Sequence, residues 1–592
     1  MLLRRCSRTF ERVCHVTWNH RLLSYGHDSK PYYITTPIFY PNSVPHIGHL
    51  HSLVIADIYA RYARLVSPSR PAYFVIGTDE HGLKIQKAAE AKGVPPAELC
   101  DLLSDKFRQL AIEANISHTK FMRTTTDEHR HAVQHLWKAL DSRGLIYKGV
   151  HSGWYSVSDE CFFTNAQIDL KIDEPTGQTV HFSKETGNVV EWTEEVNYKF
   201  RLSRFRTMLM HHFKSNEQAI KPYEQYQQII NYLETDSNIS DLSISRPSSR
   251  LSWGIPVPGD ETHTIYVWLD ALTVYLSGVG YPWPSSDYSS MWPPNLQVIG
   301  KDILRFHAIY LPAFLMALDL PLPHTLLSHA HWTVNKTKMS KSIGNVVDPF
   351  DEVKEYGADT VRYYLARVGG RFKDDTDWSK DQLEKHEAEI RSLLGNTLLR
   401  IQSHKLLERL PPSSQTLPLE HSILLPRSDT RVPGDAMQLH LGGLSLRVSQ
   451  HLNKCEVADA LGVIVDCLAL ANKELTSYAP WSLSTSSTTA VTLTTWLRET
   501  LRITGILLQP FMPTKSSQLL DALCVPSHER SWNFAQVGLG QVDAGPLKAV
   551  TLFPGPKERK VLDVEQDHES GKAKKFVKGQ KKGDGKWWKK VQ

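Results

Sequence analysis

Two histidines one helical turn apart are the first candidates for chemistry, in the segment Val44-Pro45-His46-Ile47-Gly48-His49. An apolar, β-branched run at 32–36 precedes them and predicts a strand, and the apolar spacing that follows predicts a helix. The N-terminus of a helix offers N–H groups to a phosphate, and Gly48 allows close approach of the backbone. The pattern therefore predicts a phosphate-binding turn. A metal pair or two surface histidines would have the same spacing.

A second candidate phosphate-binding segment lies far downstream, at Lys338-Met339-Ser340-Lys341-Ser342. Two lysines three residues apart in a loop rich in Ser and Gly suit a clamp on a triphosphate, although an ordinary solvated loop would look alike. Together, His-Ile-Gly-His early and Lys-Met-Ser-Lys-Ser late resemble the paired signatures of class I aminoacyl-tRNA synthetases.

The composition is that of a soluble, multidomain protein. A chain of 592 residues is too long for one core, so three or four domains are expected. Hydrophobic residues make up 41% and charged residues 22%, and no run of eighteen apolar residues predicts a membrane span. The seven cysteines contain no C-x-x-C pair, which favours a reducing compartment over a disulfide framework.

The net charge of +5 comes from the two ends of the chain. Residues 1–30 hold six basic and two acidic side chains, and residues 572–592 hold nine lysines and one acid. The remainder has 53 basic and 60 acidic residues, so its charge does not argue for nucleic acid. The arginine-rich composition of 1–30 predicts a mitochondrial transit peptide, and hence a matrix protein, rather than a plain disordered terminus.

The first half of the chain alternates strand and helix patterns. A buried-strand run at 72–77 is followed by helical patterns at 83–92, 97–114 and 127–142, so 31–148 predicts the first half of a doubly wound parallel sheet. Between 149 and 260 short aromatic runs predict an inserted β-rich module, with a helical stretch at 197–234.

The sheet is expected to resume in 261–330, with strands at 264–272 and 296–302 and a helix at 303–317. The segment 331–380 contains the lysine-rich loop and a connector. Beyond it, 381–555 predicts a helical bundle and 556–592 a disordered, Lys-rich tail. The bundle helices are expected at about 381–407, 435–453, 456–477, 492–509 and 514–523.

Five segments resemble methionyl-tRNA synthetases in particular, and the likeness extends over roughly 31–550. These segments are Tyr33–His49, Gly77–Gly82, Ile265–Tyr275, Ile299–His307 and Lys338–Asn345. The resemblance implies a class I Rossmann-like sheet with a β-rich insertion and a helical anticodon-binding domain. It also implies that methionine and ATP give methionyl-adenylate and pyrophosphate, and that the methionyl group then passes to tRNA(Met).

The same resemblance assigns roles to the two signatures. His46 and His49 would donate to the ATP phosphates, and Lys341 with Lys338 would hold the pyrophosphate together with Mg²⁺. The residues expected to line the nucleotide are His46, Gly48, His49, Gly300, Asp302, Lys338 and Lys341.

Carried over in this way, the methionine pocket consists of Ile38, Tyr40, Asp79, Trp268, Ala271, Leu272, Tyr275, Ile303 and His307. Asp79 would pair with the α-ammonium group, or else only cap a helix. Apolar contact alone discriminates by about 1–3 kcal/mol, so a polar partner for the sulfur is expected. The hydroxyl of Tyr275 and the imidazole of His307 are the candidates, whereas Trp268 and Leu272 could be plain core.

In the helical region, Asn396 and Arg400 lie on one helical face, and Pro480-Trp481 adds an indole on which a base can stack. These positions match the family's readers of the CAU anticodon, although such residues are also common in ordinary bundles.

Two features depart from the family's usual pattern. Many members carry zinc knuckles in the inserted module, but here it contains a single cysteine, Cys161, and His151 and His181 do not complete a four-ligand set. No zinc is therefore predicted. The appended dimerising domain of some relatives is also absent, so a monomer is expected.

Other classes of protein fit less well. Cysteine enzymes of class I bind zinc in the pocket, and the leucine, isoleucine and valine enzymes carry a large editing insertion. A nucleotidyltransferase shares the His-x-Gly-His turn but is much smaller. A tRNA-binding protein without catalysis would not need intact His46, His49, Asp79 and Lys341. The Lys-rich tail, with Trp587 and Trp588, is expected either to contact tRNA phosphates and bases or to be a solvated end.

Overall fold

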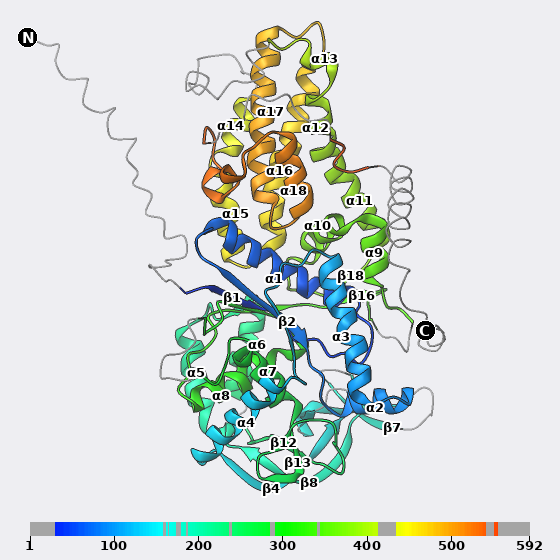
Figure 1. The fold of residues 1–592 in the computed structure, drawn as a ribbon, viewed down its shortest axis with the longest axis vertical. Coiled ribbons are helices and arrows are strands. Elements are labelled where there is room, and N and C mark those ends of the chain that lie inside the picture. The colour runs from blue at the N-terminus through cyan, green and yellow to red at the C-terminus, as the bar shows by residue number, and fades with distance from the viewer. Residues whose placement is uncertain are drawn as a thin grey trace, which may run out of the picture.

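The computed structural model describes most of the chain between residues 30 and 554. The described ranges are 30–157, 161–163, 165–172, 179–184, 187–235, 239–283, 291–339, 344–411, 434–539 and 550–554. Residues 1–29 of the predicted transit peptide, Lys341 and the predicted tail lie outside them. Figure 1 shows a helical bundle at the top, a β-rich part at the bottom and one long helix, α1 (Ile47–Val66), lying across the boundary.

The β-rich part is built on a six-stranded parallel sheet in the order β3-β2-β1-β14-β15-β9. Its strands are β1 (Tyr32–Thr35), β2 (Ala72–Thr78), β3 (Lys120–Arg123), β9 (Ile220–Lys221), β14 (Leu296–Gly300) and β15 (Leu326–His329). From β1 the strand order continues through β2 and β3 to one edge of the sheet, and from β14 it continues through β15 and β9 to the other edge. The point at which the strand order reverses therefore lies between β1 and β14. Open parallel sheets bind ligands at the carboxyl ends of such a pair. The predicted doubly wound sheet is confirmed.

The helices of the first half lie where the apolar spacing predicts them, within about one residue. They are α2 (Leu83–Lys92), α3 (Pro96–Glu113) and α4 (Asp127–Ser142). Helix α1 contacts β1, β2 and β14 on one side and α10 (Ala358–Gly369) on the other. Because both sides are covered, nearly every residue of α1 from Leu50 to Tyr62 is buried.

The inserted module is rich in antiparallel strands, as predicted. Strands β4 (Ile146–Ser156) and β8 (Glu191–Phe200) pair along almost their full length, within a sheet of order β10-β8-β4-β5. The smaller strands are β5 (Cys161–Phe163), β6 (Ile168–Ile172), β7 (Thr179–Ser183), β10 (Leu242–Ser243), β11 (Ser245–Pro247), β12 (Pro256–Val257) and β13 (Asp260–Ile265).

The predicted helical stretch at 197–234 is wrong at its start and in its middle. Residues 197–200 continue β8, because they pair with β4 and bury Phe200 completely. Helices α5 (Arg206–Ser215) and α6 (Tyr223–Thr235) follow, and the short strand β9 between them joins the edge of the parallel sheet. A two-residue strand leaves no periodic signal in a sequence.

The predicted strand at 264–272 is also wrong, because β13 ends at Ile265 and α7 (Val267–Ser277) begins two residues later. A short, continuous apolar run does not distinguish a buried strand from a buried helix. The predicted strand at 296–302 is β14, which ends at Gly300. The predicted helix at 303–317 is divided into a 3₁₀ turn η3 (Lys301–Ile303), a π-helical turn η4 (Phe306–Tyr310) and α8 (Leu311–Ala317).

The connector holds more regular structure than the sequence indicates. A small sheet of order β17-β16-β18 joins β16 (Trp332–Val334), β17 (Thr337–Lys338) and β18 (Thr376–Asp377). Helix α9 (Pro349–Tyr356) leads into α10, which packs between α1 and the bundle helix α16.

The helical bundle is confirmed. Its helices are α11 (Lys380–Ile390), α12 (Asn396–Ile401), α13 (His404–Leu407), α14 (Asp435–Leu441), α15 (Leu444–Asn453), α16 (Val457–Tyr478), α17 (Ser487–Leu508) and α18 (Pro513–Ala522). A π-helical turn, η5 (Arg391–Gly395), stands between α11 and α12. One apolar core runs from Ile34 under α1 into the bundle. Within the described ranges, no helix has both the length and the apolar character needed to cross a membrane.

Candidate active site

The phosphate turn forms the start of α1. His46 is the N-cap residue, and its Nδ1 accepts a hydrogen bond from the backbone N–H of Gly48 at 3.1 Å. The backbone N–H of His46 in turn donates to Nδ1 of His49, also at 3.1 Å. Because each Nδ1 is an acceptor, the proton of each neutral ring lies on Nε2. Both rings are therefore Nε2–H donors at a helix N-terminus.

The two imidazole rings stack with their centroids 3.8 Å apart. The ring of His49 also meets Phe39 and Phe107 edge to face, at 5.2 and 5.1 Å between centroids. Burial, and repulsion from His46 whenever that ring is protonated, lower the pKa of His49 well below its usual value. His49 is thus neutral, and it can serve as a hydrogen-bond donor without a charge of its own.

The opposite wall of the pocket is the end of β14. A Cβ atom on Gly300 would stand 2.6 Å from Oδ1 of Asp302, so only glycine fits beside this carboxylate without a shift. Desolvation opposes ionisation of Asp302, but the hydrogen bond and charge of His331, followed by the charge of Lys338, outweigh it. The pKa of Asp302 is therefore lowered, and this wall carries a negative charge.

Between these walls lies a pocket that is lined by residues of both sequence signatures. Of the predicted nucleotide residues, the pocket brings together His46, Gly48, His49, Gly300, Asp302 and Lys338. It also contains three members of the predicted methionine set, Ile38, Tyr40 and Ile303. Lys338 reaches it from the exposed strand β17, and Lys341 lies beyond the described residues.

Sequence reasoning missed three polar residues of this pocket, Ser52, His329 and His331. Nδ1 of His329 lies 2.9 Å from its carbonyl partner, Ala330 O, so its Nε2 accepts from the Ser52 hydroxyl at 2.7 Å. Burial lowers the pKa of His329 to about 4. His331 Nε2 lies 3.2 Å from Asp302 Oδ1. Their position in the sequence could have identified the two histidines, because both come at or just after the end of a buried parallel strand, where such sheets bind ligands.

One face of α7 carries four members of the predicted methionine pocket, Trp268, Ala271, Leu272 and Tyr275, at helical spacing. The helix thus explains positions that the predicted strand would have divided between two faces. The ring of Trp268 stacks on Phe306 at 3.6 Å between centroids, and Leu272 and Tyr275 are almost completely buried.

Tyr275 and His307 are joined by a buried hydrogen bond of 2.6 Å. Nδ1 of His307 donates to the carbonyl of Ile303 at 2.9 Å, so its Nε2 accepts and the Tyr275 hydroxyl donates. Burial lowers the pKa of His307 to about 4, whereas burial and the charge of Asp79 raise the pKa of Tyr275 well above its usual value. Both groups are therefore neutral across the physiological range.

Asp79 follows β2 and is 6% exposed. Its backbone N–H donates to the carbonyl of Phe39 at 2.8 Å, which ties the loop after β2 to the loop after β1. The alternative role as a helix cap does not hold, because α2 starts at Leu83 with Gly82 at its N-cap and no side-chain cap bond. The charge of Asp79 acts on Tyr275, so the carboxylate belongs to the α7 side of the site.

Two buried carboxylates that the sequence did not single out hold the loop after Asp79. Glu80 accepts hydrogen bonds from several side chains: Thr78, Ser104, Arg123 and Thr125. Asp270 on α7 accepts from His81 at 2.6 Å and from His129 at 2.7 Å. Desolvation opposes ionisation of Asp270, but the two histidines outweigh it and lower its pKa to about 2. The loop is therefore fixed on both sides of Asp79.

Of the predicted anticodon residues, Asn396 and Arg400 lie on α12, and Pro480 and Trp481 follow the end of α16; Figure 1 shows both helices in the bundle at the top. Asn396 and Arg400 are exposed on α12. The Arg400 guanidinium lies 5.9 Å from the ring centroid of Trp481 and 3.3 Å from the Thr476 hydroxyl. The carbonyl of Pro480 accepts from Arg409 at 3.0 Å. An exposed cation beside an indole is a surface on which a nucleic-acid base can stack.

A doubly wound sheet with a His-Ile-Gly-His turn after its first strand and a Lys-Met-Ser-Lys-Ser segment after its last defines the class I aminoacyl-tRNA synthetases. The family model described as tRNA synthetases class I (M) matches residues 32–402.

Two similar proteins are mitochondrial. The probable mitochondrial methionine–tRNA ligase of Schizosaccharomyces pombe is 45% identical over 505 residues, which cover 85% of this chain and 91% of that protein. The mitochondrial methionine–tRNA ligase of Homo sapiens is 44% identical over 507 residues, covering 84% and 85%.

A solved structure is also similar, that of Mycobacterium tuberculosis methionyl-tRNA synthetase bound by methionyl-adenylate. It has a TM-score of 0.79 and 36% identity, and the match covers 89% of this chain and all of that one. The chain therefore belongs to the methionine–tRNA ligase family.

Proposed function

We propose that this protein activates methionine with ATP and transfers the methionyl group to tRNA(Met) in the mitochondrial matrix. The observation that carries the proposal is the continuity of the site. The histidine pair, Asp302 and Lys338 share one pocket with Ile38, Tyr40 and Ile303, in a chain that is 45% identical to a mitochondrial relative. The predicted transit peptide supports the matrix location.

In the first step a carboxylate oxygen of methionine attacks the α-phosphorus of ATP, and the bond to the β-phosphate oxygen breaks. Pyrophosphate leaves with the Mg²⁺ that entered as part of MgATP. The Nε2–H groups of His46 and His49 would donate to phosphate oxygens as negative charge builds there. Lys338 and, from the sequence, Lys341 would hold the departing pyrophosphate. Positioning and charge stabilisation therefore account for the acceleration.

Recognition of methionine would rest on Asp79 for the α-ammonium group and on the α7 face for the side chain. The hydrogen bond from His307 Nδ1 to Ile303 leaves Nε2 without a proton, so within this pair only the Tyr275 hydroxyl has a proton to donate. That hydroxyl donates to His307 in this structure and would turn to the sulfur when methionine binds. Ile38, Tyr40, Trp268, Ala271, Leu272 and Ile303 would supply the walls, which suit a polarisable thioether.

In the second step the 2′- or 3′-hydroxyl of the terminal adenosine attacks the methionyl carbonyl, and AMP leaves. Asn396, Arg400, Pro480 and Trp481 would read the anticodon, and the contact of Arg400 with Trp481 supports this surface. The division into a catalytic sheet (31–148 and 261–330), an insertion (149–260), a connector (331–380) and an anticodon-binding bundle (381–555) is part of the proposal.

We further infer that the inserted module holds no zinc and that the protein is a monomer. A closed zinc site needs four ligands, and the module contains one cysteine, Cys161. Size-exclusion chromatography with light scattering and metal analysis of the purified protein test both inferences directly.

The function itself is tested by ATP–pyrophosphate exchange with each amino acid in turn, followed by charging of a tRNA(Met) transcript. Exchange with methionine alone, and charging that depends on the CAU anticodon, are expected. Exchange with several amino acids or with none would overturn the proposal.

A further inference from the structure

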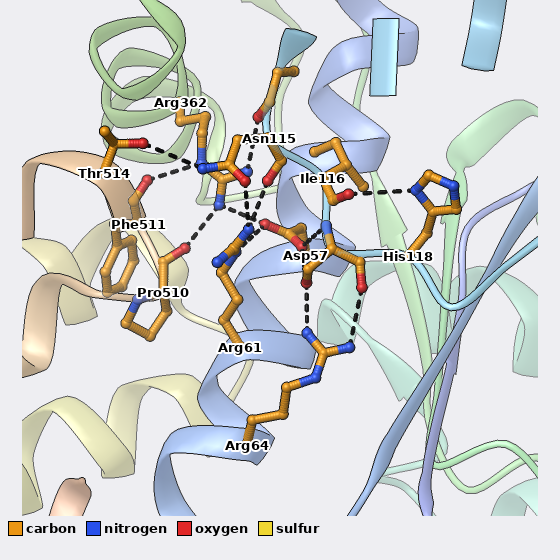
Figure 2. Close-up of polar contacts among 12 residues, drawn as sticks. Asp57, Arg61, Arg64, Asn115, Ile116, His118, Arg362, Pro510, Phe511 and Thr514 are labelled. Carbon is orange, nitrogen blue, oxygen red and sulfur yellow. Dashed lines mark hydrogen bonds and ion pairs between the residues drawn. The ribbon is translucent and has the colours of Figure 1, made fainter. Parts of the chain in front are cut away.

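Helix α1 carries a buried carboxylate three turns beyond the phosphate turn. Asp57 is 0% exposed, and both of its oxygens are used (Figure 2). Oδ1 accepts from the backbone N–H and the hydroxyl of Ser117, at 2.7 and 2.5 Å. Oδ2 contacts Arg61 Nε at 2.6 Å and Arg362 Nη2 at 2.7 Å. A residue of the catalytic sheet's main helix is thus ion-paired with a residue of α10.

Arg362 is itself 0% exposed and extends the contact into the bundle. Its Nε donates to the carbonyl of Phe511 at 3.1 Å, and its Nη2 to that of Pro510 at 2.9 Å (Figure 2). These two carbonyls form the turn between α17 and α18. A single guanidinium therefore contacts the catalytic helix through Nη2, and the turn at the end of a bundle helix through Nε and the same Nη2.

Further hydrogen bonds join the same turn to the catalytic part. Arg61 donates to the carbonyl of Asn115 at 2.7 Å, and the Asn115 amide donates to the Thr514 hydroxyl at 3.2 Å. Asp359 on α10 accepts from the backbone N–H of Lys515 at 2.6 Å. The start of α18 is thus fixed to α10 and to the loop after α3.

The turn at 510–515 is connected to the candidate anticodon surface by one helix. Helix α17 runs from Ser487, just beyond the turn that contains Trp481, to Leu508, just before Pro510. At the other side, α1 runs from Asp57 back to His46 and His49. Two helices joined by the Asp57–Arg362 contact therefore span the distance between the two candidate sites.

The chemistry of the contact favours positioning over stability. Removing two charges from water is costly, and a buried ion pair is often replaced by apolar residues without loss of stability. Arginine differs from an apolar residue in fixing direction, because its planar fork holds several acceptors at set angles. Here the acceptors belong to three elements, α1, the α17–α18 turn and the end of α3, where Ala114 O lies 3.4 Å from Nη1.

We propose that Asp57 and Arg362 are a positioning pair for aminoacylation. The pair sets the angle between α1 and the bundle, so that a tRNA bound at the Trp481 surface presents its terminal adenosine at the phosphate turn. This inference rests on the proposed function. Formation of methionyl-adenylate does not require the angle, because the sheet itself packs against α1.

The first variant is Arg362→Lys, which keeps the positive charge but not the fork. One ammonium group has no rigid geometry with which to hold Asp57 and both carbonyls at once. The second is the double variant Asp57→Asn/Arg362→Met, which removes both charges of the pair, while Arg61 keeps its hydrogen bonds to Asn115. The third is Asn115→Gly, at an exposed position with φ of 54°, which removes the side-chain contacts to Thr514 and Arg61 but replaces no charged residue.

The matched control is the ion pair between Arg502 and Glu499 inside the bundle. Its Arg502 is also 0% exposed, pairs with the carboxylate at 2.6 Å and donates to two backbone carbonyls, of Phe534 and Gln536. It is equally buried but joins no residue of the catalytic sheet. Glu499→Gln/Arg502→Met therefore reports what loss of a buried pair does by itself.

Each protein is assayed for pyrophosphate exchange, for charging of full tRNA(Met) and for charging of a minihelix that lacks the anticodon arm. Thermal unfolding measures the folded fraction. For Arg362→Lys and the double variant, kcat/KM for full tRNA should fall about tenfold relative to exchange, and for Asn115→Gly about threefold. Minihelix charging should fall no more than exchange does, because a minihelix does not contact both sites.

Three outcomes would overturn the positioning role. They are charging and exchange that fall in parallel, minihelix charging that falls as far as that of full tRNA, and the same selective loss in the Arg502 control. Failure of the proposed function would look different, because the unaltered protein would then neither exchange with methionine nor charge tRNA(Met). If the two buried variants do not fold, Asn115→Gly still tests the contact between the catalytic part and the α17–α18 turn, and an unchanged ratio of full-tRNA charging to exchange would overturn the positioning role.

Discussion

The two ends of the candidate active site are held in different ways. The proposed methionine end comprises one face of α7, the π-helical turn with His307 and the Asp79 carboxylate, and its Tyr275–His307 pair is buried and neutral. At the phosphate end an ionised Asp302 faces Lys338, which stands on an exposed two-residue strand. The first end is shaped by buried helical side chains, whereas the second combines the N-terminus of α1 with charges on a loop and an exposed strand.

This difference matches what each end must do. Telling methionine from similar side chains requires fixed geometry and a satisfied hydrogen bond, which a buried helix face provides. Stabilising a leaving pyrophosphate requires charge that acts mainly in the transition state, and exposed side chains such as Lys338 can supply it. Substitutions at the two ends should therefore change different kinetic constants.

The largest effect is expected for Lys341→Ala at the phosphate end. Adenylate formation should fall by about two to four powers of ten, while the dissociation constant of methionine changes little. Stopped-flow measurement of adenylate formation, with calorimetry for methionine, checks this. Lys338→Ala is the comparison and should lose less. An exchange rate equal to that of the unaltered protein would remove Lys341 from the mechanism.

At the methionine end, Asp79→Asn should weaken methionine binding by about two powers of ten and leave ATP binding nearly unchanged. The α-ammonium group would lose its counter-charge in a site where Asp79 is 6% exposed. Calorimetric titration measures the affinity for methionine and for ATP. Asp302→Asn is the reciprocal control, because it should weaken ATP binding more than methionine binding. Equal losses for both ligands in Asp79→Asn would make Asp79 a structural residue.

A smaller effect is expected for Tyr275→Phe, which removes the donor to His307. KM for methionine should rise about tenfold, and discrimination against norleucine should fall, because a buried acceptor is left without its donor. Tyr33→Phe is a matched control, since it removes a buried hydroxyl that donates to the backbone of Tyr275 at 2.7 Å. If the two variants discriminate equally well, Tyr275 does not recognise the sulfur.

The smallest effect concerns pH. The pKa of His307 is lowered to about 4, below the value of about 6.5 for an unfolded chain. The stabilisation by neutral His307 is complete above pH 6.5 and is lost as the pH falls toward 4, because the unfolded chain binds the proton first. Between pH 7 and 5 the free energy of unfolding should fall by about 2 kcal/mol more in the unaltered protein than in His307→Gln. Urea denaturation at both pH values measures the difference, and equal decreases would contradict a neutral His307.

Parts of the fold follow from local pattern alone. The helices at 83–92 and 127–142 begin and end where the sequence predicts them, because their apolar positions repeat every three or four residues. The prediction of a strand at 264–272 was wrong because α7 is buried on nearly all sides. A helix without a polar face shows no helical period in its sequence. Strand β9 was not predicted, because a strand of two residues forms only by pairing with a neighbouring strand of the sheet, here β15.

By itself, the sequence determined the chemistry of this protein. The histidine pair at a strand-to-helix turn, the lysine-rich segment and the residues at 268, 271, 272 and 275 are local patterns whose side-chain types limit what they can bind. Only the tertiary structure decided which nitrogen of His307 accepts, that His329 and His331 join the pocket, and that Arg362 reaches Asp57 and Phe511 together. The acceptor nitrogen of His307 is set by a bond to Ile303 four residues earlier, whereas the other two depend on groups far apart in the chain. Their hydrogen bonds exist only after the β14 edge, α10 and α17 have been brought beside α1 by burial of a common core.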